Sequence, residues 1–420
     1  MTLRLLSAAV LVAATVGLTY CSADENSTTP SIQYVPMDAP PGMSQAVVVQ
    51  GFPLVHTRQL LPLDAAGKPV GPNAADPASI DQQIEQVLDN LQAVLKESGS
   101  GLDKLVRVHI YALSVPTVDR VRELLSKRLD PSVRPAITSV LTPLPHRDAL
   151  VALDAVAVAA PEAAGESEAG GKSVKLNRCD AVAGREGYAD AAVLPAGGVV
   201  YLSGQPEDGT VTEPAVDRSM TELMKTMSLL NLSPEHVVHI KVFLQPMTSA
   251  EDVLAELKKF FPDRPTPPVV FVEWLASVPI EIEIVAQLPS IDESADNVEF
   301  FTPPDVRPST VFSKVALVNT DRQIYISGQY ARVPSRGEPQ AKHVFEQLKK
   351  ILEKTGSDMS HMAKSTYYVC DHDAARWVDR IRPKVFDPIR PPAASKLMVH
   401  AMGMEGRSMT VDMIAVPSKR

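Results

Sequence analysis

The chain has 420 residues, of which 45% are hydrophobic and 22% are charged, and its formal net charge is −9. This composition is that of ordinary globular domains, so a disordered, collagenous or coiled-coil chain is excluded for most of the length, which exceeds one average domain. The negative charge and the lack of a Lys/Arg-rich run disfavour nucleic acid as a partner, because phosphate backbones would be repelled.

Residues 1–23 are predicted to be a cleavable export signal. Arg4 supplies a positive charge, residues 5–18 form an apolar run, and small residues precede Asp24. The run is shorter than the ~20 residues needed to span a bilayer. A membrane anchor and a lipid on Cys21 are alternatives, although Tyr20 stands where a bacterial lipoprotein signal needs a small residue. We expect an exported protein, periplasmic or extracellular, that meets a membrane only through this segment.

The remainder of the chain contains three copies of one pattern. The string YLSGQ at residues 201–205 returns as YISGQ at 325–329 and, more distantly, as VHTRQ at 55–59. Each copy is followed by an amphipathic helix pattern, an alternating strand, a second helix, an Arg-Pro step and two closing strands. The helix patterns lie near residues 80–95, 118–129, 220–230, 250–261, 344–352 and 374–386.

The repeats set the domain boundaries. We predict domains at residues 31–160, 173–290 and 297–418. The first boundary, residues 161–172, is rich in Ala, Gly, Glu and Ser without an apolar period, which is typical of a flexible linker.

The repeat resembles the RidA family, also called YjgF/YER057c/UK114, whose older label is endoribonuclease L-PSP. The resemblance rests on the Ser-Gly-Gln strand, on the opening APPGMSQAV at residues 39–47, and on the closing IEIE at residues 280–283. It implies an α+β, chorismate-mutase-like domain with a mixed sheet backed by two helices. Members usually form homotrimers with small-molecule sites in the clefts between subunits. Three copies in one chain therefore predict a monomeric, intramolecular pseudo-trimer; three independent domains that trimerise with other chains are the alternative.

The resemblance also identifies a loss. In the archetypal deaminases of the family, an arginine in Pro-Ala-Arg-Ser holds the substrate carboxylate and a glutamate positions the hydrolytic water. The arginine position here holds Ile137, Pro268 and Ala394. The glutamate position keeps its residue only as Glu281, the single catalytic candidate, since Ala152 and Thr410 occupy the other two copies.

These losses predict a protein that binds small metabolites, a carboxylate or an imine, without the usual chemistry. The alternative is an enamine/imine deaminase acting through the second repeat and Glu281. Ribonuclease activity is disfavoured because the histidines form no general-base pattern. The candidate ligand-binding residues are Tyr188, Ser203, Gly204, Gln205, Phe312, Ser327, Gly328 and Gln329. For Ser-Gly-Gln a purely structural role within the sheet is the alternative.

Three further arginines precede the Pro-rich turns. Arg134, Arg264 and Arg390 could reach the clefts if those turns were rebuilt, and solvated arginines that cap a loop are the alternative. This hypothesis can be tested by measuring whether a variant with all three arginines changed to alanine still binds a carboxylate.

Metals and cofactors are not expected. The spacings CxxC, HExxH, GxxxxGK[ST] and GxSxG are absent, and three cysteines cannot build a disulfide framework. Residues 370–373 read Cys-Asp-His-Asp, but four consecutive residues cannot converge on one ion, so we expect a solvated loop. A disulfide between Cys179 and Cys370 is left open, and His109 and His239 are expected on strand faces.

Overall fold

The computed structural model describes residues 29–71, 77–166, 171–209 and 214–419. The predicted export signal and Cys21 lie outside the described residues. Within the described part, no helix has the length and hydropathy needed to cross a membrane.

The three repeats share one element order, with one additional short strand, β20, in the third. The first contains β1 (Ser31–Val35), β2 (Ala46–Gln50), β3 (Leu54–Thr57), α1 (Pro77–Glu97), β4 (Leu105–Ala112), α2 (Val115–Arg128), β5 (Ala136–Leu141) and β6 (Val151–Val158). The second contains β9 (Lys175–Asn177), β10 (Ala191–Leu194), β11 (Gly198–Glu207), α3 (Ala215–Leu229), β12 (Val237–Leu244), α4 (Ala250–Lys258), β13 (Val269–Glu273) and β14 (Ile280–Leu288). The third contains β15 (Val298–Phe301), β16 (Val315–Val318), β17 (Arg322–Gln329), α5 (Gly337–Lys354), β18 (Met362–Val369), α6 (His372–Val385), β19 (Ala393–Met398), β20 (Ala401–Met402) and β21 (Met409–Ala415). The short strands β7 (Gly165–Glu166) and β8 (Lys172–Ser173) form a separate pair near the first boundary.

The helices form where the sequence predicts amphipathic patterns. In α1 the apolar residues at helical spacing, such as Ile84, Leu88 and Leu95, are fully buried against the sheet. Gly99 follows this helix with φ +72, a left-handed conformation that glycine adopts without steric cost. The segment 370–373 is a helix start rather than a solvated loop, because the Asp371 carboxylate accepts a hydrogen bond from the Ala374 N–H at 2.7 Å and caps α6.

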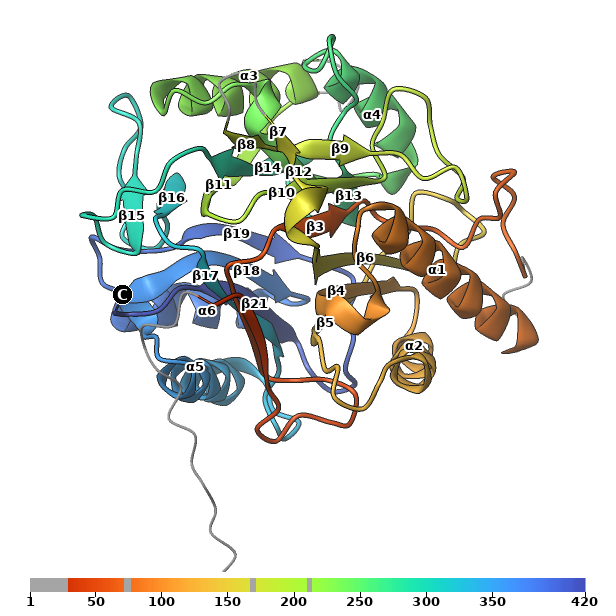
Figure 1. Ribbon diagram of the computed structural model, residues 1–420. Helices are drawn as coiled ribbons and strands as arrows, with labels where there is room; N and C mark the ends of the chain where they lie inside the picture. Colours follow the sequence, from red (N-terminus) through yellow and green to blue (C-terminus); the bar gives the residue numbers. More distant parts are fainter. Residues whose placement is uncertain (1–28, 72–76, 167–170, 210–213, 420) are drawn as a thin grey trace, which may run out of the picture.

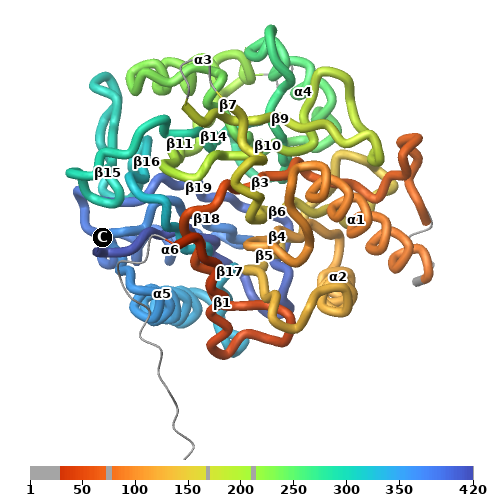
Figure 2. The backbone as a smooth tube through the Cα atoms, viewed as in Figure 1, coloured from red at the N-terminus to blue at the C-terminus, as the bar shows by residue number. Residues whose placement is uncertain are grey.

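The sheets are shared between repeats. The hairpin β9–β10 that opens the second repeat pairs with β3 of the first, and β15–β16 of the third pairs with β11 of the second. The hairpin β1–β2 at the start of the chain pairs with β17 near its end, where Val47 lies opposite Tyr325 (Figure 2). Each opening hairpin thus extends the sheet of the preceding repeat, and the first hairpin closes the ring.

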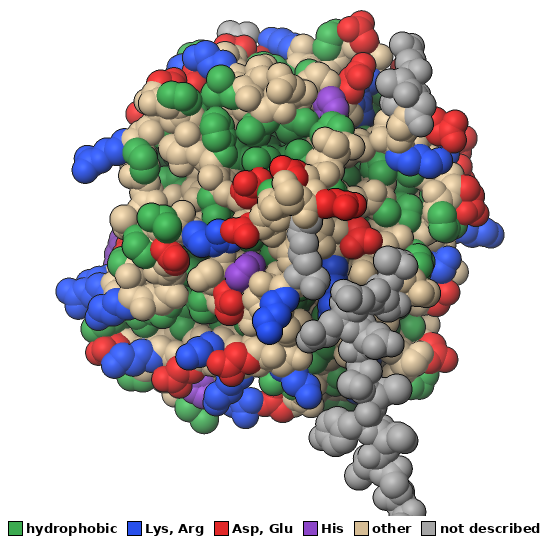
Figure 3. Space-filling model, turned by 60° about the vertical axis from the view of Figure 1, so that its left-hand side comes forward, with side chains coloured by type: hydrophobic (Ala, Val, Ile, Leu, Met, Phe, Trp, Pro, Cys, Tyr) green, Lys and Arg blue, Asp and Glu red, His purple; other side chains and the backbone are tan. Residues whose placement is uncertain are grey.

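The repeats surround a common centre. Figure 1 shows the three helix pairs at the periphery, pointing in three directions, with the sheets inside. Each sheet packs its outer face on its own helix pair and forms a separate core. The inner faces meet in two clusters to which all three repeats contribute, for example Tyr111, Phe243 and Tyr368. This arrangement is the intramolecular pseudo-trimer predicted from the sequence. On the face shown in Figure 3, acidic and basic side chains are interspersed.

Candidate functional clefts between the repeats

Three clefts follow from the exchanged hairpins. In each one, the end of the Gln-containing strand of one repeat meets the opening hairpin and the Pro-rich turn of the next repeat. The three equivalent contacts between hairpin and turn are the bridges Tyr188–Thr266, Ser313–Ala393 and Ser44–Ala136. We name the clefts by their glutamines: cleft A contains Gln59, cleft B contains Gln205 and cleft C contains Gln329.

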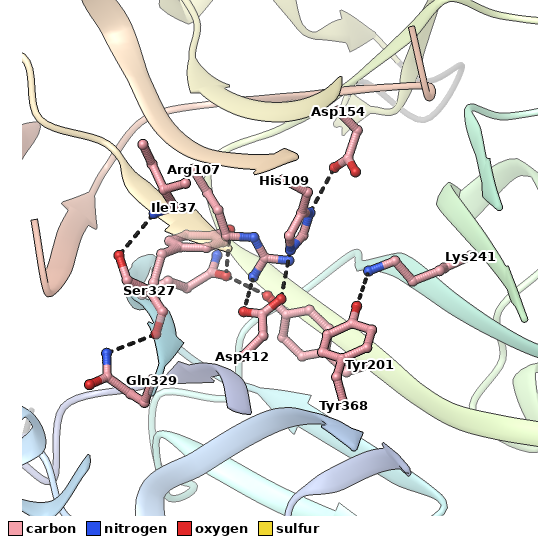
Figure 4. A network of polar contacts seen from close by, with 12 residues as sticks. Arg107, His109, Ile137, Asp154, Tyr201, Lys241, Ser327, Gln329, Tyr368 and Asp412 are labelled. Carbon is pink, nitrogen blue, oxygen red and sulfur yellow. Dashed lines mark hydrogen bonds and ion pairs between the residues drawn. The ribbon is translucent and has the colours of Figure 1, made fainter. Parts of the chain in front are cut away.

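The serines of the Ser-Gly-Gln motif join the repeats. The Ser203 hydroxyl donates to the Ser313 carbonyl oxygen at 2.5 Å and accepts from the Ala394 N–H at 2.7 Å. Ser327 does the same with Ser44 and Ile137, at 2.5 Å and 2.8 Å (Figure 4). Each hydroxyl therefore bonds two backbone groups of the next repeat. Phe312 packs against the core of the third repeat.

The three glutamines make different contacts. In cleft A, Gln59 donates to the Phe271 carbonyl at 3.1 Å and accepts from its N–H at 3.2 Å. In cleft C, Gln329 donates to Gln45 at 3.0 Å and to the Ser327 carbonyl at 2.9 Å. In cleft B, Gln205 accepts a hydrogen bond from the Lys314 ammonium at 3.0 Å. Among these, only the cleft B glutamine holds a charged group.

Cleft B also retains the family's carboxylate. Glu281 is only 8% exposed and lies against Gly204, where a Cβ atom would overlap its carboxyl group. Burial raises the pKa of Glu281 to about 7, and neighbouring Glu283 adds to this, while Ser395 and Lys364 oppose it. A carboxyl group with this pKa can both accept and donate a proton near neutral pH.

Lys314 brings a cation to the same cleft. It lines a cavity of about 660 Å³ together with Gln205, Phe260 and Pro303. Its Nζ lies 6.0 Å from the centre of the Phe312 ring. Burial lowers the pKa of Lys314, and the attraction of Glu281 works against this change.

Cleft C has a guanidinium that the repeat alignment did not reveal. Arg122 on α2 lines its cavity of about 290 Å³, beside Ile137 and Gln329. The Nη2 group donates to the Ser139 hydroxyl at 3.0 Å, and the buried Nε has no partner within the described residues. Arg332 lines the same cavity. The carboxylate position of this cleft holds Thr410, and Asp38, which also lines the cavity, pairs with Arg332.

Cleft A has a cavity of about 290 Å³ that Arg58, Gln59 and Tyr188 line, but its polar side chains contact one another and the backbone. The Arg58 guanidinium bonds Asp190 at 2.7 Å and the carbonyl oxygens of Ala183 and Gln59. The Tyr188 hydroxyl donates to the Leu254 carbonyl at 2.9 Å, and Arg185 stacks on its ring. Tyr188 therefore lies in a different cleft from Ser203, although both belong to the second repeat, because its hairpin extends the first sheet.

The arginines of the Arg-Pro steps hold turns. Arg134 donates to the Pro131 carbonyl at 3.1 Å and Arg264 to the Pro234 carbonyl at 2.9 Å. Arg390 pairs with Asp296 at 2.8 Å. The contacts seen for these arginines within the described chain are thus with backbone, with one surface carboxylate and, for Arg390, with the Phe300 ring.

A second polar cluster lies on the axis between the repeats. His109 contacts Asp154 at 3.0 Å and Asp412 at 2.6 Å, and Arg107 lies 3.4 Å from Asp412 (Figure 4). Lys364 pairs with Glu283 at 2.5 Å. His109 and His239 lie on strands, as expected, and face this axis. The sequence signal that could have revealed the cluster is the set of charged residues at alternate positions inside otherwise apolar strands.

Metal and disulfide sites are absent from the described part of the chain. No group of three His, Cys, Asp or Glu side chains there has the arrangement that holds a metal ion. Cys179 and Cys370 are free thiols.

The sequence comparison establishes the family. The model of the family described as Endoribonuclease L-PSP matches residues 60–159, 179–288 and 305–417, which together exceed half of the chain. The protein therefore belongs to this family, in which it carries three domains in tandem. The first match begins after β1, β2 and β3, the second begins after β9, and the third begins after β15.

Single-domain relatives align with about one third of the chain. A RutC family protein of Synechocystis is 30% identical over 128 residues, which cover 30% of this chain and 94% of that protein. Protein DfrA of Myxococcus xanthus is 29% identical over 112 residues, which cover 25% of this chain and 84% of that protein. Among solved structures, yeast Mmf1 is 22% identical in sequence, with a TM-score of 0.23. The match covers 31% of this chain and 100% of the Mmf1 chain.

Proposed function

We propose that the protein binds small metabolites that carry a carboxylate, and that cleft B is the principal site. The observation that carries this proposal is the Lys314 ammonium, held at 3.0 Å by Gln205 beside the cavity. Lysine binds a carboxylate as a point charge, whereas the planar guanidinium of arginine makes two parallel bonds. Lys314 would thus replace the missing arginine from a different element, the exchanged hairpin.

A second function, hydrolysis of imines or enamines, is favoured by Glu281. In the reaction, water adds to the C=N carbon, and the resulting carbinolamine expels ammonia to leave a carbonyl compound. Ionised Glu281 would take a proton from the attacking water and pass it to the nitrogen. It would then take the hydroxyl proton of the carbinolamine as the C–N bond breaks, and pass that proton to the departing ammonia. A pKa of about 7 suits both steps. Clefts A and C have Ala152 and Thr410 at this position, so they are proposed to bind without turnover.

The two functions can be separated with one set of variants. An amino-acid oxidase would generate 2-imino acids, and calorimetry would measure binding of the stable 2-oxo acids. We expect Lys314→Met to weaken binding by about 10- to 100-fold, as for loss of a charged hydrogen bond. Glu281→Gln should keep binding and lose hydrolysis. Lys342→Met, on an exposed part of α5, is the matched control. Wild-type protein that binds no 2-oxo acid would contradict the proposal.

Export and the monomeric state are also proposed on the sequence pattern. Cell fractionation with an antibody should recover the protein outside the cytoplasm, shortened by about 23 residues if the signal is cleaved. Light scattering after size exclusion should give the mass of one chain. A mass of three chains would support independent domains instead.

A further inference from the structure

The centre of the molecule contains a small polar cavity. Its volume is about 40 Å³, and all three repeats line it. The lining includes Arg107, His109, Asp154, His239, Lys241, Glu283, Lys364, Thr366 and Asp412. A water molecule needs about 10–15 Å³ of such volume, so the cavity has room for a monatomic ion and a water molecule.

Equivalent positions of the repeats face each other across this cavity. The strand registers pair His109 with Asp154, Lys241 with Glu283, and Thr366 with Asp412. In a homotrimer each such position would present three identical charges to the axis. The single chain can place different residues there, so cations and carboxylates are mixed.

The buried charges leave one positive charge in excess. Arg107, Lys241 and Lys364 oppose the carboxylates Asp154, Glu283 and Asp412. His109 adds a proton, because both ring nitrogens contact carboxylate oxygens and two donors require the protonated ring or a shared proton. His56 and His239 are neutral at pH 7, since burial lowers their pKa values to about 3 and about 4.

Of the three cations, Lys241 is the one that forms no direct ion pair in the described chain, although Glu283, Asp154 and Asp412 attract it from a greater distance. Arg107 and Lys364 form ion pairs at 3.4 Å and 2.5 Å. The Lys241 ammonium is 5% exposed and donates to the neutral Tyr368 hydroxyl at 3.3 Å, but it forms no ion pair within the part of the chain described (Figure 4). The buried Nε2 of His56 and Nε of Arg107 also lack a partner in that part of the chain. A buried, unpaired charge is costly, whereas a buried counterion would offset that cost.

We propose that the axial cavity binds one small monovalent anion of halide size, held by the Lys241 ammonium and the unpartnered Nε–H of Arg107. The anion would neutralise the excess charge where all three repeats meet. By linkage, it would stabilise the closed ring, because the site does not exist in the unfolded chain. This site is independent of the function proposed for the clefts.

The direct test is anomalous diffraction from crystals of the full chain soaked in bromide. We expect a peak on the axis within contact distance of Lys241 Nζ. In solution, the melting temperature should rise with the logarithm of chloride concentration, relative to gluconate at equal ionic strength. Gluconate is too large for the cavity. For the wild-type protein, a cavity without a bromide peak would overturn the proposal. Equal melting temperatures in chloride and gluconate would do the same.

A variant tests whether Lys241 is the residue that holds the anion. Lys241→Met should lose the axial peak and the chloride dependence, with affinity lowered at least about tenfold. Lys349→Met, which changes an exposed lysine on α5, is the matched control and should keep both. Because Lys349→Met experiences the same salts, comparing it with Lys241→Met separates anion binding at Lys241 from any general effect of chloride on stability. An axial peak that persists in Lys241→Met would contradict the role given to that lysine.

Discussion

The substitution Glu281→Gln should stabilise the protein at neutral and alkaline pH. The folded chain raises the pKa of this carboxyl from 4.5 to about 7, mainly by burial. The folded state therefore retains a proton that the unfolded state has released, and stability must fall as the pH rises from about 4.5 to about 7. A change of this size corresponds to about 3 kcal/mol. Glutamine has a similar shape and no charge to bury.

Urea unfolding of both proteins between pH 4 and pH 8 would measure this effect. At pH 4 the carboxyl is protonated in both states, so the two free energies of unfolding should be similar. At pH 8 the variant should be more stable by about 3 kcal/mol. A difference between the proteins that does not change with pH would refute the burial of an ionisable Glu281.

Glu283→Gln is the matched control on the same strand, and its effect on the free energy of unfolding should have the opposite sign. Burial alone would raise the pKa of Glu283, but the attraction of Lys364 and Lys241 lowers it overall. Its ionised form thus contributes stability that is present above the unfolded pKa and is lost as the pH falls. Removing it leaves Lys364 without its partner, so this variant should lose about 3–5 kcal/mol at pH 7.

Three further changes test the ring and cleft B. Gly204→Ala should displace the Glu281 carboxyl and remove the stability difference between pH 4 and pH 8, with a loss of about 1–3 kcal/mol; an unchanged pH profile would contradict the close contact. Deletion of residues 29–50 should leave the edge of β17 unpaired and cause oligomers in light scattering, so a stable monomer would argue against the exchanged hairpin. A circular permutant that joins Ala415 to Ser31 through a short linker and opens the chain between Glu166 and Gly171 should melt like the wild type. Ser31 and Ala415 lie at the same end of strands in one sheet, separated by three strand spacings, about 14 Å, and by two residues along the strand.

The sequence predicts the elements well because their signals are local. The helical spacing of Ile84, Leu88 and Leu95 and the repeated Ser-Gly-Gln string both lie within short segments. The exchange of hairpins could not be predicted, because an alternating strand has the same pattern in whichever sheet it pairs. For this reason Tyr188 and Ser203 belong to one repeat but to two clefts.

The candidate site was predictable only where it follows the family pattern. Glu281 occupies an aligned position, so the sequence reveals it. Lys314 stands in the third repeat's counterpart of the opening motif, at the place of Gln45, but the motif does not mark it as a ligand. Arg122 lies on a helix without a motif. The place of both residues in the clefts depends on packing between repeats. The axial charges lie in separate strands that are far apart in the sequence; His109 and Asp412, for example, are 303 residues apart, and only the closed ring brings them together.

The proposal that cleft B is the functional site is tested most directly by a crystal structure of the protein with a small 2-oxo acid. We expect density in cleft B, with the ligand carboxylate on the Lys314 ammonium beside Gln205 and its carbonyl carbon directed toward Gly204 and Glu281. A ligand bound only in cleft C against Arg122, or only at another surface, would contradict the assignment of cleft B.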